Sequence, residues 1–416
     1  MGRTIASGYG VRSRAQLIAA AIVVATSSAN ARAAGFQLLE QNASALGNAY
    51  AGTAASAEDA STVFYNPAGM TRISGRNLVM SLNAIKPSAE FQNESSNPRL
   101  GFNAGGDAGR WAFLPAFYYS QAVSSDWNVG IGVNSPFGLK TKYDSTWIGR
   151  LQGIDSSLKT FAITPSVAYR VSEAISAGAS LTAQYGTAQL TSAASLRGPV
   201  AKATGDDWGV GWGLGVLVQP LSSLRVGIDY RSSIGLALEG PFTIPGRIAT
   251  QDRASLRTPA TATLSAVAEL SPQWELLADV AWTQWSSFKS LAIINTANGA
   301  VLSETIENWS DAWRFAGGAN YKPSEQWKFR AGIAYDQTPV SDAFRTVRIP
   351  DGNRTWLAVG AQYRLTPEGT VDFGYAHVFF SDAPINQTLP RGSGLNVTGR
   401  FADAVDIVGF QYTHRF

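Results

Sequence analysis

From about residue 76 onward the chain repeats segments in which apolar side chains alternate with polar or small ones. In residues 208–218, Trp208, Val210 and Trp212 stand in one row and glycines stand in the other. Residues 327–336 set a row with Trp, Phe, Ile and Tyr against a row with Lys, Arg, Gly and Asp. Because successive side chains of a strand point to opposite faces, each segment predicts a β-strand with one apolar face and one polar or bare face.

We expect fourteen such strands, joined alternately by short turns such as Leu221–Ser223 and by long loops such as residues 138–157. Short periplasmic turns and long extracellular loops are typical of outer-membrane barrels. Two of the long loops, GPFTIPGRIAT and SLAIINTANGAVL, are unusually apolar for exposed segments. The expected strand cores are residues 76–90, 110–122, 126–137, 158–171, 174–190, 206–219, 223–239, 255–270, 274–289, 309–322, 326–338, 354–366, 370–381 and 404–416.

The contents of the two faces distinguish a membrane barrel from a soluble β-sandwich, which is the alternative. The apolar rows are long and often begin with Trp, whereas the opposite rows hold Arg, Asp, Glu and Gly. This favours an all-β, fourteen-stranded antiparallel transmembrane barrel with its apolar face toward lipid. The chain also ends in Phe416 on an alternating strand, which is the usual signal for insertion into a Gram-negative outer membrane.

Residues 1–33 have the features of a secretory signal peptide. Three arginines precede the apolar run AQLIAAAIVVA, which is shorter than the ~20 residues that a membrane-spanning helix needs. The small-x-small sequence at residues 31–33 predicts cleavage before Ala34. A membrane anchor that is not removed is the alternative.

Residues 34–75 do not follow the strand alternation, and Phe36, Leu39 and Phe64 make them too apolar for a disordered periplasmic tail. A barrel of fourteen strands has a lumen wider than its own side chains fill. We therefore expect a hatch over residues 34–75 inside a barrel over residues 76–416.

Two short sequences contain residues that restrict the backbone conformation or its hydrogen bonds. In Asn66-Pro67-Ala68-Gly69, Asn can bond the main chain two residues on and Pro fixes φ, so a rigid turn is expected. The third strand ends in VNSPFGLK, where Pro136 cannot donate a ladder hydrogen bond and Gly138 tolerates unusual dihedrals. We expect a defect in the barrel wall there, or simply the end of the strand.

The composition and the reactive side chains of the sequence argue against several classes of protein function. Only 15% of the 416 residues are charged, against about 25% in typical globular proteins. The net charge of +3 is spread along the chain, which argues against nucleic acid, and cysteine is absent. His377 with Ser381 is the one hydrolase alternative, and no Gly-x-Ser-x-Gly elbow accompanies it. We expect no enzyme activity, cofactor or metal site.

Several motifs together resemble the FadL-type long-chain fatty acid transporters of the outer membrane, over residues 34–416. They are AGFQLLEQNASALGNAYAG, AEDAST, the Asn-Pro-Ala turn, PFGLKTKY, WTQWSSF, WKFRAGIAYDQTPV and RIPDGNRTWLAVGAQY. The resemblance implies a fourteen-stranded barrel, a hatch and a ligand path that leaves sideways. In that family a kink in strand three opens a gap beside the Asn-Pro-Ala turn.

The resemblance also implies passive uptake of hydrophobic compounds, most of all long-chain fatty acids. Phe36 is the expected hatch side chain in the ligand slot, and Asn66, Pro67, Ala68, Pro136 and Gly138 are expected at the opening. By alternation Arg314 and Arg330 point into the lumen, where they would bind the carboxylate or simply pair with acids. Uptake of monoaromatic hydrocarbons, a water-filled porin and an adhesive barrel are alternatives. We expect a monomer surrounded by outer-membrane lipid and lipopolysaccharide.

Overall fold

The computed structural model describes residues 35–388 and 393–416. The expected signal peptide, residues 1–33, and the expected mature start at Ala34 lie outside the described residues. The strands are β1 (Arg76–Asn93), β2 (Ala112–Ala122), β3 (Trp127–Asn134), β4 (Gly138–Lys142), β5 (Asp155–Arg170), β6 (Ile175–Ala193), β7 (Val200–Leu221), β8 (Leu224–Arg231), β9 (Ile234–Ile244), β10 (Ile248–Thr258), β11 (Thr261–Glu269), β12 (Trp274–Thr283), β13 (Ser290–Asn295), β14 (Val301–Ile306), β15 (Ala312–Tyr321), β16 (Trp327–Asp336), β17 (Arg354–Arg364), β18 (Gly369–Phe380), β19 (Ala383–Thr388) and β20 (Asn396–Arg415).

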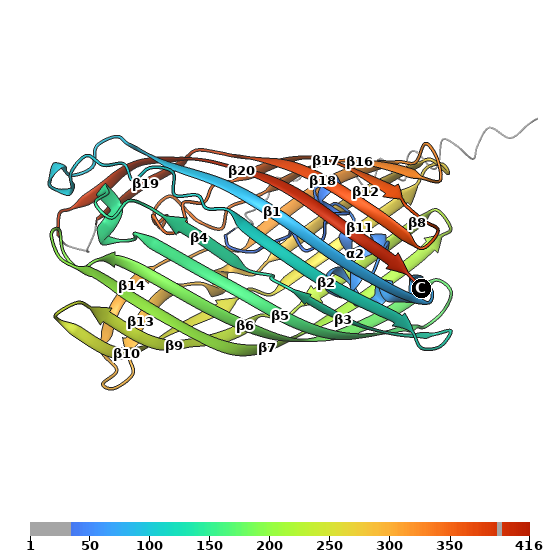
Figure 1. The fold of residues 1–416 in the computed structure, drawn as a ribbon, viewed down its shortest axis with the longest axis horizontal. Coiled ribbons are helices and arrows are strands. Elements are labelled where there is room, and N and C mark those ends of the chain that lie inside the picture. Colours follow the sequence, from blue (N-terminus) through green and yellow to red (C-terminus); the bar gives the residue numbers. More distant parts are fainter. Residues whose placement is uncertain (1–34, 389–392) are drawn as a thin grey trace, which may run out of the picture. The chain divides into compact units, whose positions relative to one another are not determined.

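These segments form one closed antiparallel barrel (Figure 1). We call each full-length strand of the barrel a stave, whether it is continuous or interrupted. Six staves are each interrupted once, namely β3/β4, β8/β9, β10/β11, β12/β13, β14/β15 and β18/β19. Counting each interrupted pair as one stave gives fourteen, which confirms the predicted number. β1 closes the barrel by pairing with β20 from Asn77↔Arg415 to Asn93↔Gly399.

Several staves extend beyond their predicted cores. Residues 290–308, predicted as an apolar loop, instead form the β13/β14 hairpin. The other apolar loop belongs largely to the paired strands β9 and β10. Both predictions of loops were wrong. These parts of the strands lie beyond the membrane-facing rows of apolar side chains, so their sequences lack the alternation that marks the rest of each strand.

The two faces of the wall have the predicted contents. Trp208, Val210 and Trp212 on β7 are exposed on the outside of the barrel. Arg314 and Asp279 are buried on the inside. This arrangement confirms the inside-out pattern. Among the described residues, no helix combines the length and apolarity needed to cross a bilayer.

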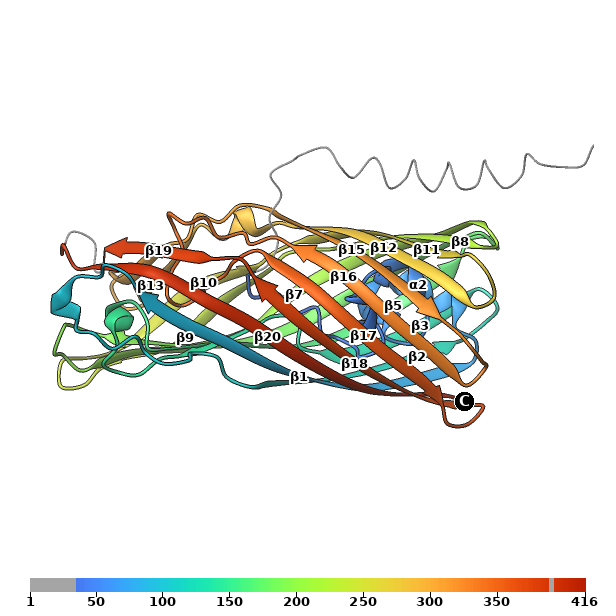
Figure 2. The ribbon, with the colours of Figure 1, turned by 90° about the horizontal axis from the view of Figure 1, so that it is seen from above.

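Residues 35–75 form the hatch, which lies inside the ring of strands toward the end where the C-terminus lies (Figures 1 and 2). Its short helices are η2 (Leu46–Asn48), α2 (Thr53–Ser56), α3 (Thr62–Tyr65) and η3 (Pro67–Arg72). Leu46, Ala49 and Tyr50 pack against inward side chains of the wall such as Trp356 and Ile407. The hatch is therefore part of the protein core, and not a separate layer on it.

Wall glycines let the hatch main chain lie directly on the strands. A Cβ on Gly332 would overlap the main chain of Asn48, and one on Gly227 would overlap that of Ala54. The predicted glycine row on β7 contacts the hatch only at Gly215, where an added Cβ would overlap the side chain of Asn66. Farther along β7, the glycines at 209 and 211 instead leave room for Ile234 of β9.

Candidate functional site

The third stave is broken where Pro136 interrupts it. β2 pairs with β3 only over Phe117–Ala122, and β4 pairs with β5. The β2 residues before Phe117 therefore have no strand partner on that side. Proline cannot donate a ladder hydrogen bond, and Pro136 stands between β3 and β4. The break leaves an interruption in the hydrogen-bonded wall between β2 and β4.

The start of the hatch pairs with this break. The Leu38 amide donates to the Pro136 carbonyl over 2.9 Å, and the Gly138 amide donates to the Phe36 carbonyl over 2.9 Å. The Gln41 side-chain amide donates to the Ser135 carbonyl over 2.9 Å. The backbone groups that the broken ladder leaves free are thus bonded by an arm of the hatch, residues 35–41, which we call the arm.

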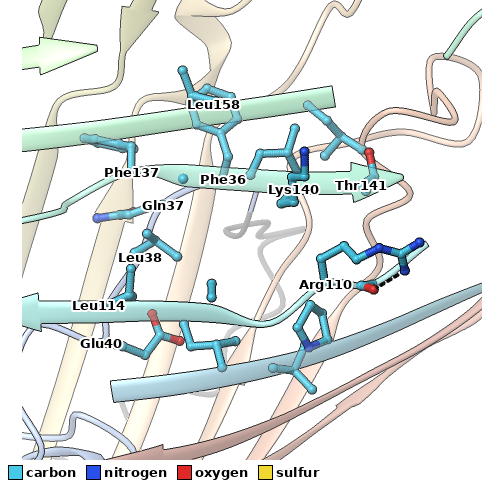
Figure 3. Close-up of a pocket in the computed structure, with 18 of the residues that line it drawn as sticks. Phe36, Gln37, Leu38, Glu40, Arg110, Leu114, Phe137, Lys140, Thr141 and Leu158 are labelled. Carbon is cyan, nitrogen blue, oxygen red and sulfur yellow. Dashed lines mark hydrogen bonds between the residues drawn. The ribbon is translucent and has the colours of Figure 1, made fainter. Parts of the chain in front are cut away.

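A cavity of about 900 Å³ occupies the break. This volume is in the range of small-molecule sites. Its inner lining includes Phe36 and Leu38 of the arm, and its outer lining includes Phe113 and Phe161, which are exposed on the outer face. Figure 3 shows Leu38 between the segment with Lys140 and the segment with Leu114. The cavity therefore runs from the lumen to the outside of the wall.

Phe36 fills a cage of aromatic rings beside this cavity. Its ring centroid lies 4.6 Å from that of Trp285, 5.8 Å from those of Phe288 and Trp309, and 6.2 Å from that of Phe137. Both Trp side chains are almost fully buried. Edge-to-face packing of this kind adds to the free energy of burying an aromatic ring. Phe36 thus lies in an apolar slot, and its predicted role as the hatch side chain that occupies the ligand slot stays a prediction.

Besides Glu40, the charged side chains that line the cavity are Arg110, Lys140, Lys142, Lys159, Asp351, Arg354 and Asp403. Lys140 pairs with Asp155 at 2.7 Å, and Arg110 donates to main-chain carbonyls near the outer end. At the inner end, Arg354 pairs with Asp351 at 2.8 Å and donates to the Gly35 carbonyl over 3.1 Å. The Gly35 amide donates in turn to Asp351 over 3.0 Å. An ion pair therefore holds the first described residue of the arm.

Glu40 is the one acid of the arm, and it also lines the cavity. Its side chain is almost fully buried, and its Oε2 atom has no hydrogen-bond partner. Burial raises the pKa of Glu40 to about 7, against smaller lowering effects from nearby amides and from Arg354. A carboxyl group in this environment holds its proton near neutral pH.

The structure does not bring Arg314 and Arg330 to the cavity, and their role as a joint carboxylate site stays a prediction. Arg314 pairs with Asp279 at 3.2 Å and donates to the Ala49 carbonyl. Arg330 pairs with Asp372 at 2.8 Å and with Glu58 of the hatch at 2.9 Å. Both guanidinium groups pair with acids and contact the hatch, as the alternative to a carboxylate site expected, although Arg314 Nε and Arg330 Nη1 are buried without a hydrogen-bond partner.

Glu58 fastens the hatch to the wall at this point. Lys328 also donates to its Oε1 atom. Although burial opposes ionisation, Arg330 and Lys328 hold the pKa of Glu58 below its usual value. The acid therefore stays charged and the ion pairs persist over the physiological pH range.

The Asn-Pro-Ala turn has the predicted shape but lies elsewhere. The Ala68 amide donates to Asn66 Oδ1 over 3.0 Å, which confirms the local bond. Asn66 Nδ2 donates to the Ala54 carbonyl over 2.7 Å and to the Val216 carbonyl of β7 over 3.1 Å. Asn66, Pro67 and Ala68 do not line the cavity, so their expected position beside it was wrong. The arm occupies that position instead.

Sequence reasoning missed several residues of the site: Glu40, Trp285, Phe288, Trp309, Asp351 and Arg354. Trp285 and Phe288 lie in WTQWSSF, and Asp351 and Arg354 lie in RIPDGNRTW. These two motifs contribute to the family resemblance, but the resemblance assigns no role to these four residues.

The side chain of His377 bonds that of Asp406 at 2.8 Å. Among the described residues, no cluster of His, Cys, Asp and Glu is suited to a metal ion.

The fold and the cavity define a transmembrane β-barrel whose lumen holds a hatch and whose wall is interrupted at one stave. The family model described as outer membrane protein transport protein (OMPP1/FadL/TodX) matches residues 23–416. The chain belongs to this family, which consists of outer-membrane transport channels.

Known relatives agree with this assignment. The chain is 30% identical over 406 residues to the long-chain fatty acid transport protein of Salmonella typhi, covering 89% of this chain and 93% of that protein. The crystal structure of a Pseudomonas aeruginosa FadL homologue has a TM-score of 0.87 at 25% identity and covers 92% of this chain and 100% of its own. The Pseudomonas putida toluene transporter TodX shares the fold, with a TM-score of 0.67 at 14% identity, over 90% of this chain and 98% of its own.

Proposed function

We propose that this protein carries long-chain fatty acids passively across the outer membrane and releases them sideways through the break in the third stave. One observation carries the proposal: a single cavity has the arm of the hatch on its inner side and exposed phenylalanines on its outer side. Relatives named as fatty acid transport proteins support the choice of substrate. The proposed role involves no catalysis.

In the proposed route, an acyl chain replaces Phe36 in its aromatic cage and then moves along the cavity toward Phe113 and Phe161. The apolar lining suits a hydrocarbon chain. The hatch need not leave the lumen, because only the arm lies across the path. We further propose that signal-peptide removal precedes function, that the protein acts as a monomer, and that lipopolysaccharide surrounds its outer end.

Uptake of monoaromatic hydrocarbons is the second candidate, because the aromatic cage around Phe36 would also accept a small neutral ring. The two candidates differ in the need for a group that recognises a carboxylate. Parallel uptake measurements with oleate and toluene distinguish them.

A bulky side chain in the break tests the route. A Cβ on Gly138 would lie 2.9 Å from the Leu38 side chain, so Gly138→Trp fills the inner part of the cavity. We expect at least about tenfold slower oleate uptake at equal surface expression, as for a change of about 1.4 kcal/mol in the barrier. Gly317→Trp is the matched control, because nothing lies within 4 Å of its Cβ position.

Unchanged oleate uptake by Gly138→Trp would show that ligands do not pass through the break. Single-channel conductance in planar bilayers provides a second check on the class of channel. Large, steady ohmic steps would show a water-filled porin and would contradict a lumen closed by the hatch.

A further inference from the structure

Three side chains that line the cavity carry a buried polar atom without a hydrogen-bond partner, namely Glu40 (Oε2), Trp356 (Nε1) and Asp403 (Oδ1). Of these three, Glu40 belongs to the arm. Glu40 is 6% exposed, and its Oε2 atom lacks a hydrogen-bond partner. Apolar side chains that line the same cavity include Leu114, Val378 and Ile407. A buried carboxyl group without a partner is costly, so its retention in a ligand cavity indicates that a ligand supplies the missing bond.

The fixed cation of the inner cavity is already neutralised. Arg354 is bonded to Asp351 and to the Gly35 carbonyl. Asp403 on β20 adds a further acid to the lining. A carboxylate that entered here as an anion would therefore find no uncompensated positive charge at the inner end, and burying an unpaired charge is strongly unfavourable.

We propose that Glu40 recognises the substrate's carboxylate by sharing its own proton with it, and that the substrate then leaves through the break as the neutral acid. This inference rests on the proposed transport of fatty acids. In the bound pair, Glu40 donates its O–H to a carboxylate oxygen of the ligand. On transfer, the Glu40 O–H bond breaks, a ligand O–H bond forms, and the charge moves to Glu40. Glu40 then recovers a proton from hydronium in the water that enters the empty cavity.

Other charged and titratable groups near Glu40 are compatible with this role. Arg354 of β17 favours its charged form and Asp336 of β16 opposes it, while the hatch contributes Tyr50 and Tyr65. Burial is the largest effect and keeps the carboxyl protonated up to about pH 7. Above that pH a charged Glu40 repels a carboxylate ligand, so binding of fatty acids weakens as pH rises, while binding of neutral ligands does not.

Equilibrium binding to the purified full chain tests the proposal with oleate and oleyl alcohol, between about pH 5.5 and 8.5. Between these two pH values, we expect the decrease in oleate affinity to be at least about tenfold larger for the wild type than for Glu40→Gln. The amide of Glu40→Gln donates a hydrogen bond at every pH. Glu40→Asp should retain the steep dependence. Oleyl alcohol should bind alike to all variants at every pH. Glu94→Gln on an extracellular loop is the control, and heat-modifiable mobility checks that each barrel is folded.

The outcomes separate this inference from the proposed function. Equal pH dependence of oleate binding in the wild type and Glu40→Gln, with oleyl alcohol still bound, overturns the role of Glu40 alone. A parallel loss of oleyl alcohol binding in Glu40→Gln also overturns it, because the residue would then only shape the cavity. If neither probe binds the wild-type protein, the proposed function itself fails.

Discussion

Replacing Phe36 with Ala tests whether the arm competes with the ligand for the aromatic cage. Phe36 is 3% exposed and touches four aromatic rings. Phe→Ala at a buried position costs about 3–5 kcal/mol. Because the arm is also held by its main-chain bonds to Pro136 and Gly138, we take the lower end, about 3 kcal/mol, as the loss in docking of the arm. At 1.4 kcal/mol per factor of ten, this loss raises the undocked population about 100-fold.

A ligand that must displace Phe36 should then bind up to about 100-fold more tightly, because less of its binding free energy is used to undock the arm. Hydrogen exchange of the Leu38 amide, which bonds the Pro136 carbonyl in the docked arm, should accelerate in parallel. Phe102→Ala is the control, since that side chain is 85% exposed. Faster exchange at Leu38 with unchanged oleate affinity would refute competition for the cage.

Two further predictions concern the fixed part of the hatch. Asn66→Ala leaves the Ala54 and Val216 carbonyls without their donor, so we expect a local loss of about 1–3 kcal/mol and slower uptake; the barrel should remain heat-modifiable, and an unchanged proteolysis rate within the hatch would contradict the loss. Arg330→Met breaks the pairs with Asp372 and Glu58 and should change oleate and toluene uptake alike; a selective loss of oleate uptake would instead support Arg330 as a carboxylate site.

The barrel could be predicted because lipid imposes a regular pattern on the strands that cross it. Trp208, Val210 and Trp212 must face the membrane, so their alternation is visible in the sequence. Beyond that band the outward positions become polar, and β14 was therefore mistaken for a loop. The break at Pro136 was predictable as a possibility, since proline removes a donor, but its alternative as a strand end could not be excluded without the pairing of the neighbouring strands.

The candidate site was predicted only in part, for a different physical reason. Phe36 was recognisable as an apolar side chain at the start of the hatch. Alternation gives the direction of Arg330 but not its partner, and the pair with Glu58 joins residues 272 positions apart. The burial of Glu40 likewise depends on contacts from several strands, so its sequence neighbours give no signal of it.

The direct contact between hatch and wall main chains limits which movements are open to this protein. At Gly332 and Gly227 the hatch lies where a single added Cβ would overlap it, and Asn66 reaches through to the carbonyl of Val216. A hatch that contacts the wall in this way cannot move along the barrel axis unless its contacts with many strands break at the same time. The arm, in contrast, is held by a few bonds at one stave. Transport through this barrel should therefore need no external source of energy to extract the plug, and the outer membrane would remain sealed to water and ions while a hydrophobic molecule passes.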